Sequence, residues 1–131
     1  MLRALTRLIS RHGVSGTSLA DVGLTAGYSR GLPVERFGSK RAMIEALLES
    51  MDAWFRESLV AKLDGKRGLA ALVARIDAHL EGAQRSRTAT AALYSIYVES
   101  LCVMPELRPR VAVVTEGWRQ GIAQHLREGQ T

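Results

Sequence analysis

Cysteine and long apolar runs are scarce in this sequence of 131 residues, and each scarcity excludes a class of protein. The single cysteine, Cys102, excludes an internal disulfide framework and agrees with a reducing compartment. No apolar run is long enough to span a membrane. The first residues, Met1-Leu2-Arg3, lack the apolar stretch and cleavage site of a secretory signal. We therefore expect a cytosolic protein that does not contact a membrane.

The alternation of apolar and polar residues that marks a half-buried strand is also missing. Apolar residues instead recur at spacings of three and four from end to end, which predicts an all-α chain of about seven helices. His12-Gly13 ends the first helix, Thr17 or Ser18 caps a short second one, and Ser29 is placed to cap a third. Ser39 caps a long fourth helix that is predicted to end near Leu63.

The later helices are expected to bury their larger apolar residues. For the fifth helix these are Leu69, Leu72, Val73, Ile76 and Leu80. The sixth and seventh are expected to bury Leu93, Ile96, Tyr97, Leu101, Met104, Leu107, Val111, Val114, Trp118, Ile122 and Leu126.

Acidic residues are scarce in the first third of the chain. Residues 1–41 hold seven basic and two acidic side chains, and the remainder holds eleven of each, so the first third carries the whole net charge of +5. A polyanion such as DNA is the simplest partner for this segment, and a solvated basic surface kept for solubility is the alternative.

The most informative stretch runs from Thr17 to Lys40. It predicts two short helices joined by a tight turn, with Gly23 four residues before the turn-forming Gly27. A glycine inside a helix costs about 1 kcal/mol relative to alanine, so Gly23 indicates a close approach of the two helices. In a helix-turn-helix the second of these helices lies in the major groove.

The ordered motifs of this region resemble the TetR/AcrR family of bacterial repressors. They are Arg-His-Gly-Val-Ser-Gly-Thr-Ser-Leu-Ala-Asp-Val (residues 11–22), Ala-Gly-Tyr-Ser-Arg-Gly (26–31) and Arg-Phe-Gly-Ser-Lys (36–40). The resemblance is dense from about Leu2 to Leu48, and later residues share only a helical layout. It implies a DNA-binding domain over residues 1–48 and a helical effector-binding and dimerisation domain over residues 49–131.

The resemblance also implies roles for particular residues. Thr17, Ser18 and Lys40 match positions that hold the phosphate backbone, and Ser29, Arg30, Gly31 and Leu32 match the first turn of the recognition helix. Arg30 is the candidate for reading guanine, with a simple phosphate contact as the alternative. Glu35 and Arg36 complete the predicted DNA-binding set, and Glu35 is expected to pair with Arg36 or another nearby cation, or else to accept from cytosine.

The sequence departs from the family at several points. Family members usually carry an aromatic residue near Val34 and often a second aromatic residue or a histidine near Glu35, and this chain has neither. Pro33 is expected about four residues into the recognition helix. The chain is also expected to be a shortened form that lacks a basic arm before the first helix and two helices after Thr131. Such a chain would bind DNA weakly, with little specificity and with strong dependence on salt.

The helical body contains candidates for an effector site: Tyr94, Tyr97, Glu99, Met104 and Trp118. For each of them ordinary packing is the alternative, and Glu99 could equally face solvent or pair with an arginine. The three histidines and Cys102 lack the spacing of metal ligands, and no set of residues suggests catalysis or a cofactor.

These observations predict a regulator that binds operator DNA as a homodimer and is released by a small effector. The alternative is a helical interaction protein that keeps the fold without reading an operator.

Overall fold

The computed structural model describes residues 1–130, and these residues form helices without any strand. The helices are α1 (Leu2–His12), α2 (Leu19–Thr25), α3 (Leu32–Phe37), α4 (Lys40–Leu63), α5 (Gly68–Arg85), α6 (Arg87–Cys102), the short 3-10 helix η1 (Pro105–Leu107) and α7 (Arg108–Gly129). The predicted all-α class with about seven helices is confirmed. Thr131 lies outside the described residues.

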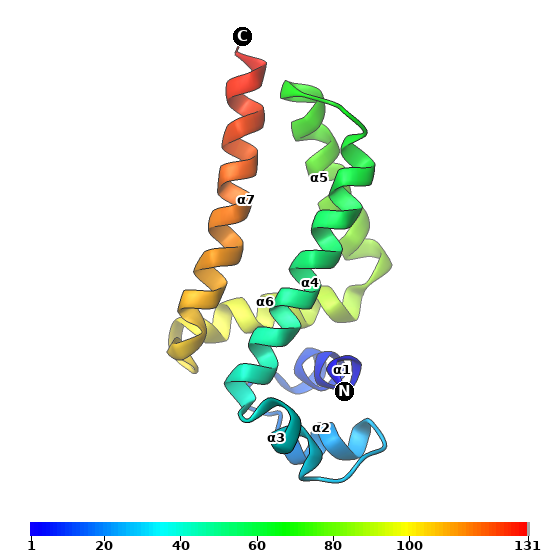
Figure 1. Cartoon of the computed structure of the whole chain (residues 1–131), viewed down its shortest axis with the longest axis vertical. Helices are drawn as coiled ribbons and strands as arrows, with labels where there is room; N and C mark the ends of the chain where they lie inside the picture. Colours follow the sequence, from blue (N-terminus) through cyan, green and yellow to red (C-terminus); the bar gives the residue numbers. More distant parts are fainter. Residues whose placement is uncertain (131) are drawn as a thin grey trace.

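The long helices α4, α5 and α7 run alongside one another, and α6 meets the lower ends of α5 and α7 and passes α4 part-way along its length (Figure 1). Helix α1 packs against α6, while α2 and α3 form the opposite end of the molecule from the C-terminus. The helix-turn-helix is therefore attached to the body through both α6 and the continuous helix α4.

Local signals in the sequence set several helix ends. Gly13 ends α1 with a φ of 73°, a left-handed conformation that glycine adopts without steric cost. The hydroxyls of Ser18 and Ser39 accept from the backbone N–H groups of Asp21 and Ala42, each at 3.1 Å. Both serines are thus N-caps, of α2 and α4, as predicted.

One apolar core joins the helix-turn-helix to the body. Leu5 and Ile9 of α1 pack with Ile44 and Leu48 of α4 and with Ile96 of α6, all of them almost completely buried. Helix α4 passes without a break through residues 48 and 49, where the sequence predicts a domain boundary. Movement of α4 or α6 must therefore displace side chains that pack against α1.

The buried face of α5 differs from the predicted one. Leu69, Val73, Ile76 and Leu80 are each more than half exposed, whereas Gly68, Ala71 and Ala74 are buried. The small residues let α5 approach its neighbours closely: a Cβ added at Gly68 would lie 3.1 Å from the Cα of Gly129 on α7. Close packing of small residues thus overrides the burial of the larger ones.

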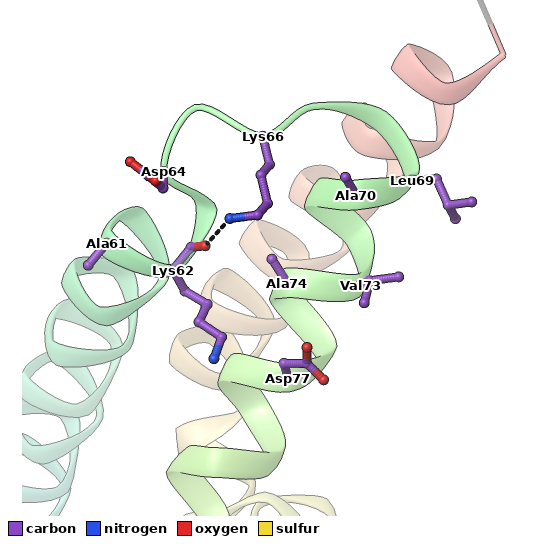
Figure 2. A pocket seen from close by; sticks show the side chains of 9 residues that line it. All are labelled: Ala61, Lys62, Asp64, Lys66, Leu69, Ala70, Val73, Ala74 and Asp77. Carbon is purple, nitrogen blue, oxygen red and sulfur yellow. Dashed lines mark hydrogen bonds between the residues drawn. The ribbon is translucent and has the colours of Figure 1, made fainter.

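A shallow groove separates the end of α4 from the start of α5 (Figure 2). Leu69 and Val73 point away from α4, and Lys66 donates to the carbonyl of Lys62 at 3.4 Å. An ion pair of 2.5 Å between Lys62 and Glu81 joins the two helices.

Three further apolar residues were expected inside and are exposed. They are Leu101 on α6 and Ile122 and Leu126 on α7. Helix α7 instead turns Gly121 toward the Arg75 guanidinium of α5 and buries His125. The periodicity on these helices is compatible with more than one face, and only the neighbouring helices select one.

Replacing Gly117 by alanine is expected to stabilise the protein. Gly117 lies in the interior of α7, is exposed, and leaves open space around an added Cβ. The substitution removes backbone freedom from the unfolded chain and should raise the free energy of unfolding by about 0.5–1 kcal/mol. Urea unfolding measures the change. Gly65→Ala is the control, because its φ of 75° opposes a side chain although the space is equally open; a lower midpoint for Gly117→Ala would contradict the prediction.

Candidate DNA-binding surface

Two residues with predicted phosphate contacts, Thr17 and Ser18, lie between α1 and α2 and form hydrogen bonds there. Thr17 is 3% exposed, and its hydroxyl donates to the carbonyl of Gly13 at 2.8 Å. Its side chain therefore supports the turn, and the phosphate contact at Thr17 stays a prediction. Ser18 is exposed, and its hydroxyl donates to the Asp21 carboxylate at 2.7 Å while it caps α2.

Helices α2 and α3 meet at Gly23. A Cβ added there would lie 2.3 Å from the carbonyl oxygen of Ser29 and 3.1 Å from Cδ of Pro33. The backbone of Gly23 also accepts from the N–H of Tyr28 at 2.9 Å, and Gly27 turns the chain with a φ of 82°. The close approach predicted for Gly23 is confirmed, and it fixes the angle at which α3 is presented.

Helix α3 begins later than the sequence suggests. Ser29 is not its cap: Gly31 occupies the N-cap position, and Pro33 is the second helical residue. A proline at that position has no intrahelical N–H to lose, so it does not disturb the helix. Pro33 is buried and packs toward Gly23.

The predicted recognition residues lie around the start and along the outer face of α3. Ser29, Arg30, Gly31, Glu35 and Arg36 are exposed, and Leu32 is half-buried. Within residues 1–130 neither Glu35 nor Arg36 makes an ion pair, so the expected pairing of Glu35 is not found. Both charges are presented to solvent on the same short helix.

Lys40 lies at the first residue of α4, directly after the cap Ser39. Burial lowers the pKa of its ammonium from the ordinary value, and the nearby carboxylate of Glu99 partly raises it. The charge of Glu99 on α6 thus acts on Lys40, the predicted phosphate-binding lysine, although the two residues are far apart in the sequence.

The predicted effector residues separate into three groups. Tyr94 and Tyr97 of α6 contact each other at right angles, and Trp118 of α7 stacks on Phe55 of α4 and contacts His79 of α5. The hydroxyl of Tyr94 lies 3.1 Å from Nε2 of His79. These five residues, from four helices, form what we call the aromatic cluster.

The other two candidates lie elsewhere. Met104 packs against the apolar core shared with α1. The carboxylate of Glu99 binds backbone N–H groups in the turn between α1 and α2, which occupies the oxygens expected to contact an effector. The contacts of Trp118 with Phe55 and His79 were not predicted, because the spacing of residues in the sequence does not show which helices pack together.

Two buried polar atoms of the aromatic cluster make no hydrogen bond within the described chain. They are the Tyr97 hydroxyl and Nε1 of Trp118. Burial, the charge of Asp52 and the neighbouring Tyr94 raise the pKa of Tyr97 to about 12, so its phenol remains protonated. Both groups are therefore available as donors.

Across residues 1–130, no three His, Cys, Asp or Glu side chains gather as a metal site, and no helix is long and apolar enough to cross a membrane. Cys102 is exposed near the end of α6.

Comparison with known proteins adds one match. The family model for bacterial regulatory proteins of the tetR family matches residues 1–47, which span α1 to α3 and the first turns of α4. No curated protein matches the chain significantly. The matched segment is the helix-turn-helix with the exposed surface described above. Residues 1–47 are therefore similar to the helix-turn-helix domain of bacterial tetR-family regulators, which supports a DNA-binding transcriptional regulator.

Proposed function

We propose that this regulator is a repressor that leaves its operator when a small molecule binds in its helical body. Residues 1–48 would contact DNA, and residues 49–131 would bind the effector and the second subunit. The observation that carries the proposal is the exposed basic surface around α3, where Arg30 and Arg36 make no ion pair within residues 1–130, beside the close packing at Gly23. A helix-turn-helix with this charge suits the major groove.

Each exposed residue has a distinct proposed role. Arg30 can donate two hydrogen bonds to O6 and N7 of a guanine. Lys40 and Ser18 contact phosphates on either side of the groove, together with Ser29, Gly31 and Leu32 at the start of α3. Glu35 faces the same surface and suits a cytosine amino group, and Arg36 adds a phosphate contact.

The aromatic cluster is the proposed effector site. Buried donors without acceptors are rare in proteins, and Tyr97 and Trp118 provide two of them between apolar rings. The arrangement favours a flat, largely apolar molecule with two acceptor atoms. Tyr94 adds a further ring from α6 beside Tyr97.

Operator recognition requires a homodimer in this proposal. Paired recognition helices must lie about 34–36 Å apart to read successive major grooves. The exposed apolar residues Leu69, Val73, Ile76 and Leu80 on α5 support the presence of a covering partner in the working assembly.

The experiment screens small molecules for ligands that raise the melting temperature and then measures their effect on binding to promoter DNA. A ligand of the aromatic cluster should quench tryptophan fluorescence and weaken DNA binding by about 5- to 150-fold, the usual range of such coupling. Trp118→Phe should abolish the fluorescence response to the ligand, and Tyr97→Phe should weaken the ligand.

Trp54→Phe is the matched control, because Trp54 lies half exposed on α4 outside the cluster. A ligand that bound equally well to Trp118→Phe and Tyr97→Phe would place the site elsewhere. A protein that binds no promoter DNA at any salt concentration would favour the alternative, a helical interaction protein. The exposed Val34 and Glu35 on α3, where DNA would require favourable contacts, are the observation behind that alternative.

A further inference from the structure

One carboxylate of the body holds the turn that leads into the helix-turn-helix. Glu99, on α6, accepts the N–H of Val14 through Oε1 at 2.8 Å and the N–H of Ser15 through Oε2 at 2.9 Å. Ser95, one helical turn earlier, donates its hydroxyl to Oε1 at 2.9 Å. Both carboxylate oxygens are thus engaged, and we call this set of three hydrogen bonds the Glu99 clasp.

Gly13, the residue before Val14 and Ser15, leaves space for the carboxylate of Glu99. Gly13 has a φ of 73°, and a Cβ added there would lie 2.5 Å from Oε1 of Glu99. Any larger residue at position 13 would therefore meet both a strained backbone and the carboxylate itself. The turn and the carboxylate fit each other at atomic contact.

The clasped turn connects directly to the start of α2. The N–H of Thr17 donates to the carbonyl of Val14 at 3.3 Å, and the Thr17 hydroxyl donates to the carbonyl of Gly13 at 2.8 Å. The next residue, Ser18, is the N-cap of α2. The position of α2 is consequently tied to α6 through the hydrogen bonds of this short turn.

The clasp carries a negative charge at neutral pH. Burial raises the pKa of Glu99, but the hydrogen bonds from Ser15, Val14 and Ser95 outweigh that effect and hold the pKa below its ordinary value. The same charge acts on Lys40 at the start of α4. A single side chain of α6 therefore acts on two of the segments that the proposed DNA surface uses.

We propose that Glu99 is a positioning residue for DNA binding, which ties the turn before α2 to α6 so that a displacement of α6 moves the helix-turn-helix. The proposal deepens the proposed function and rests on it. Tyr94 and Tyr97 of the aromatic cluster lie on the same helix, within two turns of Glu99. An effector that shifts this part of α6 would pull on the clasp.

The first experiment compares Glu99→Ala and Glu99→Gln with the wild-type chain in hydrogen exchange and in binding to promoter DNA. Exchange of the Val14 and Ser15 amides should accelerate in both variants, because alanine removes both acceptors and glutamine keeps one. DNA affinity should fall by about tenfold for Glu99→Ala and less for Glu99→Gln.

The direction in which Glu99→Ala changes DNA affinity distinguishes loss of the Glu99 clasp from loss of a negative charge. Removing a carboxylate near Lys40 should strengthen DNA binding if charge alone mattered, because repulsion of phosphates is lost. The clasp requires weaker binding instead. Glu57→Gln is the control: it removes the same charge from an exposed position on α4 and should leave the exchange of both amides unchanged.

The second experiment displaces the Glu99 carboxylate by adding a side chain at Gly13. Gly13→Ala should weaken DNA binding and accelerate exchange of both amides, whereas Gly65→Ala, with a similar φ of 75° and open space, should affect neither. In the Glu99→Ala background, Gly13→Ala should cost less than it does alone, since the collision with Oε1 is gone.

The outcomes distinguish this inference from the function on which it rests. Unchanged exchange of Val14 and Ser15 in Glu99→Ala, or unchanged affinity for a DNA that the wild type binds, would overturn the positioning role. Absence of DNA binding by the wild type, with faster exchange in the variants, would instead contradict the proposed function and leave the clasp as a purely structural link.

Discussion

The double substitution Arg30→Ala and Lys40→Ala is expected to weaken binding to promoter DNA by about a hundredfold. Arg30 is exposed just before α3 and makes no ion pair with any of residues 1–130, and Lys40 is the first residue of α4. A bidentate contact between arginine and guanine provides about 1–3 kcal/mol of discrimination, and a lost phosphate contact adds to that. Fluorescence anisotropy with labelled DNA at several salt concentrations measures the change.

The two single variants should fail in different ways. Lys40→Ala should weaken binding to all sequences alike and reduce the slope of log affinity against log salt by about 0.9, the value for one phosphate contact. Arg30→Ala should mainly reduce the preference for one base. If Arg30→Ala lost the same affinity for promoter DNA and for random DNA, Arg30 would contact a phosphate and not a base.

The control removes the same charge at a distance. Lys66 and Arg127 are exposed, the first in the loop between α4 and α5 and the second near the end of α7. These segments lie at the end of the molecule opposite α2 and α3 (Figure 1). Replacing both by alanine lowers the net charge by the same two units. If that variant lost as much affinity as the Arg30 and Lys40 pair, general charge and not the helix-turn-helix surface would account for binding.

Gly23→Ala is expected to have the largest effect on the helix-turn-helix itself. The added methyl would lie 2.3 Å from the Ser29 carbonyl oxygen, which belongs to the backbone, and 3.1 Å from the ring of the buried Pro33. Neither neighbour can rotate away, so α3 must shift relative to α2. Overpacking of this kind costs about 1–3 kcal/mol, against a gain in helix propensity of about 1 kcal/mol.

The shift should abolish DNA binding even where the chain stays folded, because α3 would enter the groove at another angle. Circular dichroism during thermal unfolding and DNA anisotropy measure the two effects together. Gly31→Ala is the matched control, since it adds the same methyl in the same module with nothing within 4 Å. The prediction fails if Gly23→Ala and Gly31→Ala bind DNA with equal affinity.

Local chemistry made the helix-turn-helix predictable. Ser18 and Ser39 cap helices because a serine hydroxyl reaches the backbone N–H three residues on, and Gly13 ends α1 because it tolerates a positive φ. Gly23 indicated a close contact from its helical setting alone. These effects act over a few residues, so sequence suffices to locate them.

The helical body was less predictable, because the faces of its helices depend on neighbours that are distant in sequence. On α5 the larger residues Leu69 and Val73 satisfied the expected spacing, yet the structure buries Ala71 and Ala74, which allow closer approach. Ser29 was likewise a plausible cap, but the chain between Gly27 and Gly31 continues as a turn before α3 begins.

The sequence by itself determined the all-α class, the N-terminal concentration of positive charge and the order of motifs that identifies the helix-turn-helix. These properties depend on composition and on short-range spacing. Only the tertiary structure decided which charges remain unpaired, that Thr17 turns inward, and that Glu99 binds the turn before α2 across 84 and 85 residues of chain. Hydrogen bonds between distant segments require the folded backbone to bring donor and acceptor together, and no spacing in the sequence encodes that distance.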